Sequence, residues 1–110
     1  MGYIYHIITN KKWQTAKELG SYRPQSFTVE GFIHCSLAEQ VAATAGRYYS
    51  GVPDLIVLKI NTQKLKSEIR NEEAPNGSWY PHIYGELNIN AVDDEMPLGC
   101  APDGSLQFEG

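Results

Sequence analysis

The stretch Tyr3-Ile4-Tyr5-His6-Ile7-Ile8-Thr9 opens the chain with β-branched and aromatic residues, a composition that is typical of a β-strand. Successive side chains of a strand point to opposite faces, so Ile4, His6 and Ile8 would share one face. The other face would carry the odd-numbered residues: Tyr3, Tyr5 and Ile7. This pattern places a histidine inside an apolar strand, where its imidazole needs a hydrogen-bond partner.

A short helix is expected after this strand, over Lys11–Leu19, because Asn10 can cap its first turn and Gly20 can end it. A second strand is predicted at Glu30–Cys35. The segment Ser36–Glu39 then has the sequence of a capping box, in which serine and glutamate side chains bind the free amides at the start of a second helix.

The second half of the chain is predicted to be mostly strand. Leu55–Ile60 has apolar residues on both faces, which favours a central position in a sheet. Lys64–Arg70 is expected to form a short helix or an irregular turn. Strand-like segments follow at Trp79–Tyr84, Leu87–Val92 and Leu106–Phe108. Strands and helices mix without regular βαβ alternation, so the sequence predicts one α+β domain over residues 1–110.

The composition excludes several classes of protein. The 110 residues carry a formal net charge of −4, whereas a general nucleic-acid binder usually shows a basic face. Apolar runs such as Leu55–Leu58 are far shorter than the roughly 20 residues of a membrane helix. We therefore expect a cytoplasmic protein with no general nucleic-acid or membrane partner. Cys35 and Cys100 are compatible with reduced thiols in that compartment, and the sequence leaves a disulfide between them open as the alternative.

Three histidines, His6, His34 and His82, each lie in an apolar strand-like segment. Each could be a core histidine that binds a backbone carbonyl. Convergence on one cleft would instead satisfy all three imidazoles and create a site. Their spacings of 28 and 48 residues differ from the local His-x-x-x-His pattern of many catalytic zinc sites, so no metal is predicted.

Cys35 and Ser36 each have a structural and a chemical interpretation. Neighbouring residues of a strand point to opposite faces, so His34 is badly placed to activate Cys35 as a nucleophile. Cys35 is expected to pack inward with Ile33. Ser36 would cap a helix, although a helix start also offers amide donors to an anionic ligand.

Two motifs, GFIHCS at Gly31–Ser36 and YPHIYG at Tyr80–Gly85, resemble those of a small bacterial family, the domain of unknown function 952. The run Tyr5–Thr9 followed by Trp13, and the segment Glu72–His82, are similar as well, so the resemblance spans nearly the whole chain. That family in turn resembles the ADP-ribosyltransferase fold. The resemblance implies a small split antiparallel sheet, two or three short helices, and a cleft that holds NAD in active members.

The same resemblance implies roles for individual residues. In that superfamily a histidine of the first strand contacts a ribose, and His6 matches it by position. An aromatic residue of the second strand stacks on nicotinamide, and that position falls on Ile33, or on His34 if the register shifts by one. An acidic residue of a later strand holds the other ribose, where this chain offers His82, Tyr84 and Glu86.

These observations lead us to expect a nucleotide-related enzyme with NAD or a related nucleotide as its substrate. Glu72, just before a predicted turn, is the expected acidic helper at the rim of a cleft, because a carboxylate would stabilise positive charge that develops as the nicotinamide bond breaks. The other expected site residues are the catalytic His6, His34 and His82 and the ligand-binding Thr9, Ser36 and Tyr84. The alternative is a domain that binds a ligand or a protein without catalysis.

Overall fold

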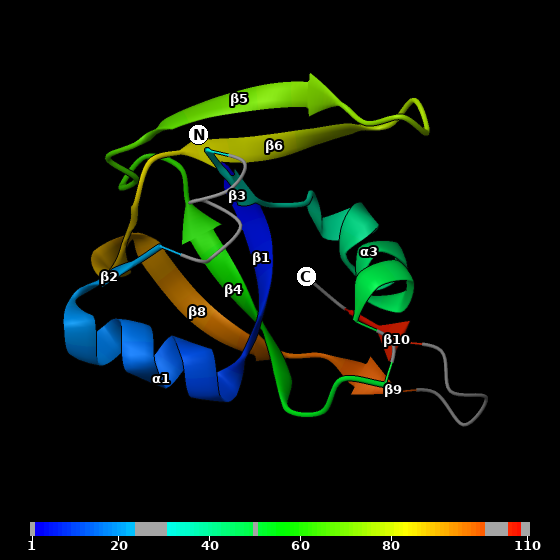
Figure 1. Cartoon of the computed structure of the whole chain (residues 1–110), viewed down its shortest axis with the longest axis horizontal. Coiled ribbons are helices and arrows are strands. Elements are labelled where there is room, and N and C mark those ends of the chain that lie inside the picture. The colour runs from blue at the N-terminus through cyan, green and yellow to red at the C-terminus, as the bar shows by residue number, and fades with distance from the viewer. Residues whose placement is uncertain (1, 24–30, 50, 101–105, 109–110) are drawn as a thin grey trace.

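Strand β1 (Tyr3–Thr9) pairs with β4 (Leu55–Asn61), which in turn pairs with β8 (Val92–Pro97) (Figure 1). The computed structural model describes residues 2–23, 31–49, 51–100 and 106–108. Strand β4 lies at the centre of this sheet, so the prediction of a central strand at Leu55–Ile60 is confirmed. Its apolar residues meet neighbours on both sides, and Leu58 is fully buried.

A second sheet has the order β3-β6-β5, with β3 at Ile33–His34, β6 at Trp79–Tyr84 and β5 at Glu68–Glu73. In Figure 1 the β5–β6 hairpin lies at the top of the molecule. Two short strand pairs complete the described sheets: β2 (Ser21–Tyr22) with β7 (Leu87–Asn88), and β9 (Gly99–Cys100) with β10 (Leu106–Gln107). All pairings among the described strands are antiparallel, which confirms the predicted α+β class.

Within the described ranges, a reciprocal pair of backbone hydrogen bonds joins the two three-stranded sheets. The N–H of Tyr5 donates to the carbonyl of Ser36 at 2.8 Å, and the N–H of Ser36 donates to the carbonyl of Tyr5 at 2.7 Å. Ser36 follows β3 closely, so this contact joins β1 of the first sheet to the end of a strand of the second.

The two faces of β1 bury different clusters, as its alternation predicts. Ile4 and Ile8 pack in one cluster with Trp13, and Tyr5 and Ile7 pack in the other. The first cluster also contains Ile33, Leu58, Ile60, Ile83 and Leu87 from other strands. This arrangement explains why both faces of the strand are apolar.

Two helices cover β1 from opposite sides (Figure 1). Helix α1 (Asn10–Leu19) buries Trp13 and Ala16 in the first cluster, and α3 (Val41–Tyr48) buries Val41 and Ala45 in the second. Two short 3₁₀ helices, η1 (Ala38–Gln40) and η2 (Ile89–Ala91), lie elsewhere in the chain. Among the described residues, no helix is long and apolar enough to cross a membrane.

Both predicted helix starts are displaced by one residue. Thr9, rather than Asn10, caps α1 by accepting a hydrogen bond from the Lys12 N–H, while Gly20 ends the helix with a φ of 89°, as predicted. The predicted capping box of Ser36 and Glu39 is wrong. Because the backbone of Ser36 pairs with β1, it stays extended, and the first turn begins after Leu37, whose N–H donates to Gln40 Oε1.

The least accurate predictions concern polar or mixed segments. The end of Lys64–Arg70 forms the start of strand β5, because pairing with β6 fixes a backbone that has no strong propensity of its own. The predicted strand Leu87–Val92 is divided by η2. Of the predicted strand Glu30–Cys35, Glu30 lies outside the described residues and β3 covers only Ile33–His34.

Gly85 and Gly46 provide a matched pair of stability predictions. Gly85 has a φ of 157°, and an added Cβ would collide with Ser67, whose hydroxyl is held by a hydrogen bond to the Glu86 carbonyl. We expect Gly85→Ala to lower the free energy of unfolding by about 1–3 kcal/mol. Gly46 lies in α3 with open space around it, so Gly46→Ala should raise it by about 0.5–1 kcal/mol. Urea unfolding of both variants checks this, and effects of the same sign would contradict it.

Candidate functional site

The β3-β6-β5 sheet has one apolar and one polar face. Ile33 and Ile83 are directly paired and fully buried in the first core cluster. Their neighbours His34 and His82 are also directly paired and point the opposite way, because side chains alternate along a strand. We call this polar side the outer face; it carries Phe32, His34, Glu68, Arg70, Glu72, His82 and Tyr84.

The carboxylate of Glu72 is the polar centre of the outer face. Its Oε1 accepts hydrogen bonds from His82 Nδ1 at 2.7 Å and from the Tyr84 hydroxyl at 2.5 Å. Both hydrogen bonds lower the pKa of Glu72, and the one from Tyr84 has the larger effect. The same hydrogen bond raises the pKa of Tyr84. Glu72 is therefore ionised and Tyr84 protonated at neutral pH.

The Glu72 carboxylate also sets the tautomer of His82. An ionised carboxylate only accepts hydrogen bonds, so Nδ1 of His82 must carry a proton. The neutral imidazole then has its lone pair on Nε2. A histidine held in this way can accept a proton from a bound molecule, and the nearby carboxylate stabilises the resulting cation. The side chain of Glu72 is 39% exposed, whereas that of His82 is 13% exposed and so reaches the surface over a small part of its ring.

Aromatic rings surround this pair. The ring of Phe32 stacks on His82 with a centroid distance of 4.2 Å and an interplanar angle of 17°. The rings of His34 and Tyr84 lie 4.8 and 5.3 Å from Phe32, and His34 meets His82 edge to face at 5.2 Å. These contacts fix the ring orientations, and they give the outer face flat apolar surfaces beside its charged groups.

Arg70 supplies a cation at the edge of the cluster. It lies directly opposite His82 in the sheet, and its guanidinium lies 4.3 Å from the centroid of the Tyr84 ring. Glu68 accepts hydrogen bonds from its Nε and Nη2 at 3.0 and 3.2 Å. This exposed ion pair contributes little to stability, so the guanidinium can exchange Glu68 for an anionic ligand at small cost.

The structure therefore brings four of the expected site residues together, namely His34, His82, Glu72 and Tyr84. Phe32 and Arg70 belong to the same cluster and were not predicted as site residues. For Phe32 a signal was present, since it stands two residues before His34 and so shares its face. Arg70 could be found only from the register of β5 against β6.

His6 lies elsewhere, on the core side of the sheet. It is 6% exposed, its Nδ1 lies 2.6 Å from the backbone carbonyl of His34, and its Nε2 lies 3.0 Å from the Tyr22 hydroxyl. Burial lowers the pKa of His6 to about 4, so the ring is neutral. A carbonyl only accepts, so Nδ1–H donates to His34 and Nε2 accepts from Tyr22.

The other expected residues also lie outside the cluster. Thr9 caps α1, and the Ser36 hydroxyl donates to Thr44 Oγ1 at 3.4 Å. Cys35 is buried beside Ile33, as predicted, and burial raises the pKa of its thiol, which makes it a poor nucleophile. Within the described part of the chain, no three His, Cys, Asp or Glu side chains are arranged to hold a metal ion.

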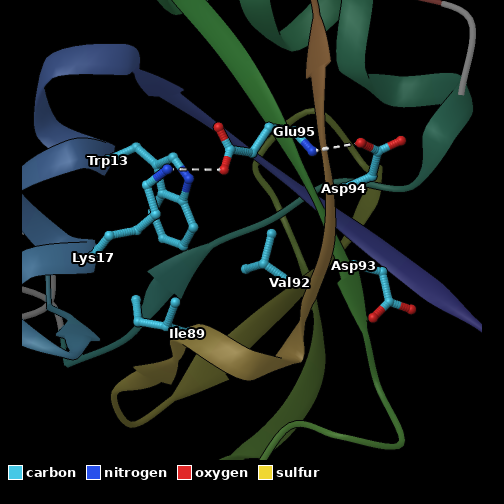
Figure 2. A pocket seen from close by; sticks show the side chains of 7 residues that line it. All are labelled: Trp13, Lys17, Ile89, Val92, Asp93, Asp94 and Glu95. Atoms are coloured by element: carbon cyan, nitrogen blue, oxygen red, sulfur yellow. Dashed lines mark hydrogen bonds and ion pairs between the residues drawn. The ribbon is translucent and has the colours of Figure 1, made fainter.

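A hollow of about 290 Å³ lies between α1 and β8 and contains none of the expected site residues (Figure 2). Lys17 Nζ lies 3.2 Å from Glu95 Oε2 there. The indole N–H of Trp13 is buried without a well-formed hydrogen bond, and its approach to Glu95, together with Lys17, lowers the pKa of that carboxyl. Lys17 and Glu95 thus pair within the hollow, and Asp93 is held from outside it by Lys64 Nζ at 2.7 Å. The outer face remains the candidate site.

The fold and the site together define a small antiparallel α+β domain with a histidine–carboxylate–tyrosine cluster on one sheet face. The chain belongs to the family described as "Protein of unknown function (DUF952)", which it matches over residues 7–95. This confirms the family resemblance seen in the sequence. No curated protein matches the chain.

Solved structures of one bacterial protein are similar over almost the full length. The crystal structure of protein CC0527 from Caulobacter crescentus is 30% identical, with a TM-score of 0.84 over 96% of this chain and 93% of that one. The crystal structure of a double mutant of CC0527 is 29% identical, with the same TM-score and coverage. The solution structure of CC0527 is 30% identical, with a TM-score of 0.80 over 96% and 91% of the two chains.

The burial of neutral His6 predicts a loss of stability in acid. Its pKa is about 4 when folded and about 6.5 when unfolded, so the unfolded chain takes up the proton first as the pH falls. The contribution of neutral His6 to the free energy of unfolding is complete above pH 6.5 and is lost as the pH falls to about 4. The loss amounts to about 3 kcal/mol. Urea unfolding at about pH 7.5 and about pH 4.5 measures this difference.

Two variants identify the residue responsible. His6→Asn should be less stable at neutral pH but should lose less stability on acidification, because asparagine does not titrate. His34→Gln should keep most of the acid-induced loss, since burial is the largest cause of the lowered His6 pKa and the charge of the His34 side chain is a smaller one. If His6→Asn loses as much stability on acidification as the wild-type protein does, groups other than His6 cause the loss.

Proposed function

We propose that the outer face binds NAD or a related nucleotide and that Glu72 and His82 act on it through charge stabilisation and proton transfer. The observation that carries this proposal is the shared carboxylate of Glu72, which accepts hydrogen bonds from both His82 and Tyr84. The substrate class rests on the resemblance of the family to the ADP-ribosyltransferase fold.

The surroundings of the carboxylate support a ligand with flat rings and phosphates. Phe32 already stacks on the His82 ring, and a base or a nicotinamide ring can extend such a stack. Arg70 lies beside this stack, on Tyr84, and a guanidinium matches the geometry of phosphate oxygens. Nucleotides combine both features in one molecule.

The proposed reaction breaks the bond between nicotinamide and its ribose. The bonding electron pair leaves with the nicotinamide nitrogen, and positive charge develops on the sugar. Ionised Glu72 would stabilise that charge. A nucleophile, which is water when no other acceptor is present, would form a new bond to the same sugar carbon. His82 Nε2 would accept the proton of that nucleophile, while Tyr84 keeps its own proton and orients the carboxylate.

A domain that binds such a ligand without catalysis is the second candidate. The exposure of the site favours it, since the side chains of His34 and Arg70 are exposed and water reaches the cluster. Water weakens the electrostatic stabilisation on which catalysis would depend.

Replacement of Glu72 tests both candidates. We expect NAD, ADP-ribose or nicotinamide to shift the backbone amide resonances of β5 and β6 in the wild-type protein. Glu72→Gln should reduce the release of nicotinamide from NAD by about 100-fold or more, because it removes the charge and frees the His82 tautomer. Proton NMR of the free nicotinamide measures this rate.

Glu73→Gln is the matched control, since it removes the same charge from the next residue of the same strand, whose side chain lies on the other side of the sheet. It should retain nearly all binding and turnover. Amide shifts without nicotinamide release in the wild-type protein would support binding alone. No shifts with any of the three ligands, or equal effects of the two variants, would overturn the nucleotide proposal.

A further inference from the structure

The backbone of His34 points toward β1, not toward β6. Its neighbour Ile33 pairs with Ile83, and the N–H of Cys35 donates to the carbonyl of Pro81 at 3.1 Å. The N–H and C=O groups of residues 33 and 35 therefore point toward β6, and those of residues 34 and 36 point away from β6, toward β1. Ser36 accordingly pairs with Tyr5 of β1.

In a continuous antiparallel ladder, Ile7 would be the partner of His34. Tyr5 lies opposite Ser36 in an antiparallel bridge. A shift of two residues forward along β1, to Ile7, therefore corresponds to a shift of two residues back along the other strand, to His34. No such pairing continues between the described residues of β1 and β3, because the bridge at Tyr5 is isolated. The ladder thus ends before it reaches the carbonyl of His34, at the point where the two sheets diverge.

The side chain of His6 binds this carbonyl in place of the Ile7 backbone. Its Nδ1–H donates to the His34 carbonyl at 2.6 Å, and its ring is almost completely buried. On the other side of the ring, the hydroxyl of Tyr22 donates to Nε2 at 3.0 Å. Tyr22 is itself 8% exposed and belongs to β2, so the imidazole connects the first three strands of the chain, β1, β2 and β3.

We propose that His6, held by Tyr22, is a positioning residue that fixes the backbone of His34 and thereby the place of the His34 imidazole on the outer face. That ring lies 4.8 Å from Phe32 and 5.2 Å from His82. Because the Cα of His34 carries both the carbonyl and the side chain, a backbone that moves at this point carries the ring away from its neighbours. The inference concerns the site on which the proposed function rests, but it does not depend on the identity of the ligand.

A direct contact of His6 with substrate does not fit this geometry. Both ring nitrogens already have protein partners, and the ring faces the core cluster of Ile4 and Ile8. A substrate on the outer face would be separated from it by β3 itself.

The test uses the ligand-free full chain and NMR of the histidine rings. In the wild-type protein, the ring protons of His34 and His82 should give a mutual nuclear Overhauser effect, and Phe32 should shift the His34 resonances by its ring current. His6→Leu keeps a side chain of similar volume without a donor. It should lose the Overhauser effect and move the His34 ring shifts toward those of a free histidine.

His6→Asn is the rescue variant, because its amide nitrogen can donate from nearly the position of Nδ1. It should retain most of the His34 ring-current shift. Ile8→Val is the stability control, since it weakens packing on the same face of the same strand without touching His34. It should leave the His34 signals unchanged even though it destabilises the fold.

If His6→Leu does not fold, Tyr22→Phe replaces it in the test. This variant leaves the ring of His6 in place and removes its second partner, so the Overhauser effect should weaken without complete loss. Unchanged His34 signals in folded His6→Leu, or in Tyr22→Phe where His6→Leu is unfolded, would overturn the positioning role. Because no ligand is present, a failure of nucleotide binding would leave this result unaffected.

Discussion

The hydrogen bond from the His6 imidazole to the His34 carbonyl lies at the point where the β1-β4-β8 sheet and the β3-β6-β5 sheet separate. Strands paired through their backbones lie about 4.8 Å apart, and a ring inserted between two strands requires a wider gap. Tyr5 and Ser36 keep the strands together on one side of this point. On the other side the two sheets diverge, and the β3-β6-β5 sheet can cover the core with one face and expose the other.

The parts of the fold that were predictable from sequence are those in which apolar residues dominate. Strand β1 was predicted with its two faces assigned correctly, and β4 was predicted as a central strand. Strand β5 was not predicted, because Ile69 is the only aliphatic residue in Glu68–Glu73. Its conformation depends on pairing with β6, and a tertiary interaction of this kind leaves no local signal.

The candidate site was predictable to a similar degree. The motifs identified His34, His82 and Tyr84 as candidates, and the position before a turn identified Glu72. Their juxtaposition depends on the register of three strands, which a single sequence does not specify. His6 was grouped with them because it occupies the same kind of apolar segment. Sequence alone could not distinguish an imidazole that serves the core from one that faces outward.

The alternation of side chains along β6 also places the residues needed for packing and the residues that can bind a ligand at different positions of the strand. Pro81 and Ile83 face the interior and determine whether the strand packs, while His82 and Tyr84 face outward and determine what the surface can bind. Substitutions at the outward positions change chemistry with little effect on the core. A scaffold of this kind can acquire a new ligand, or lose an old activity, by exchanging every second residue of a strand while the remaining residues preserve its shape.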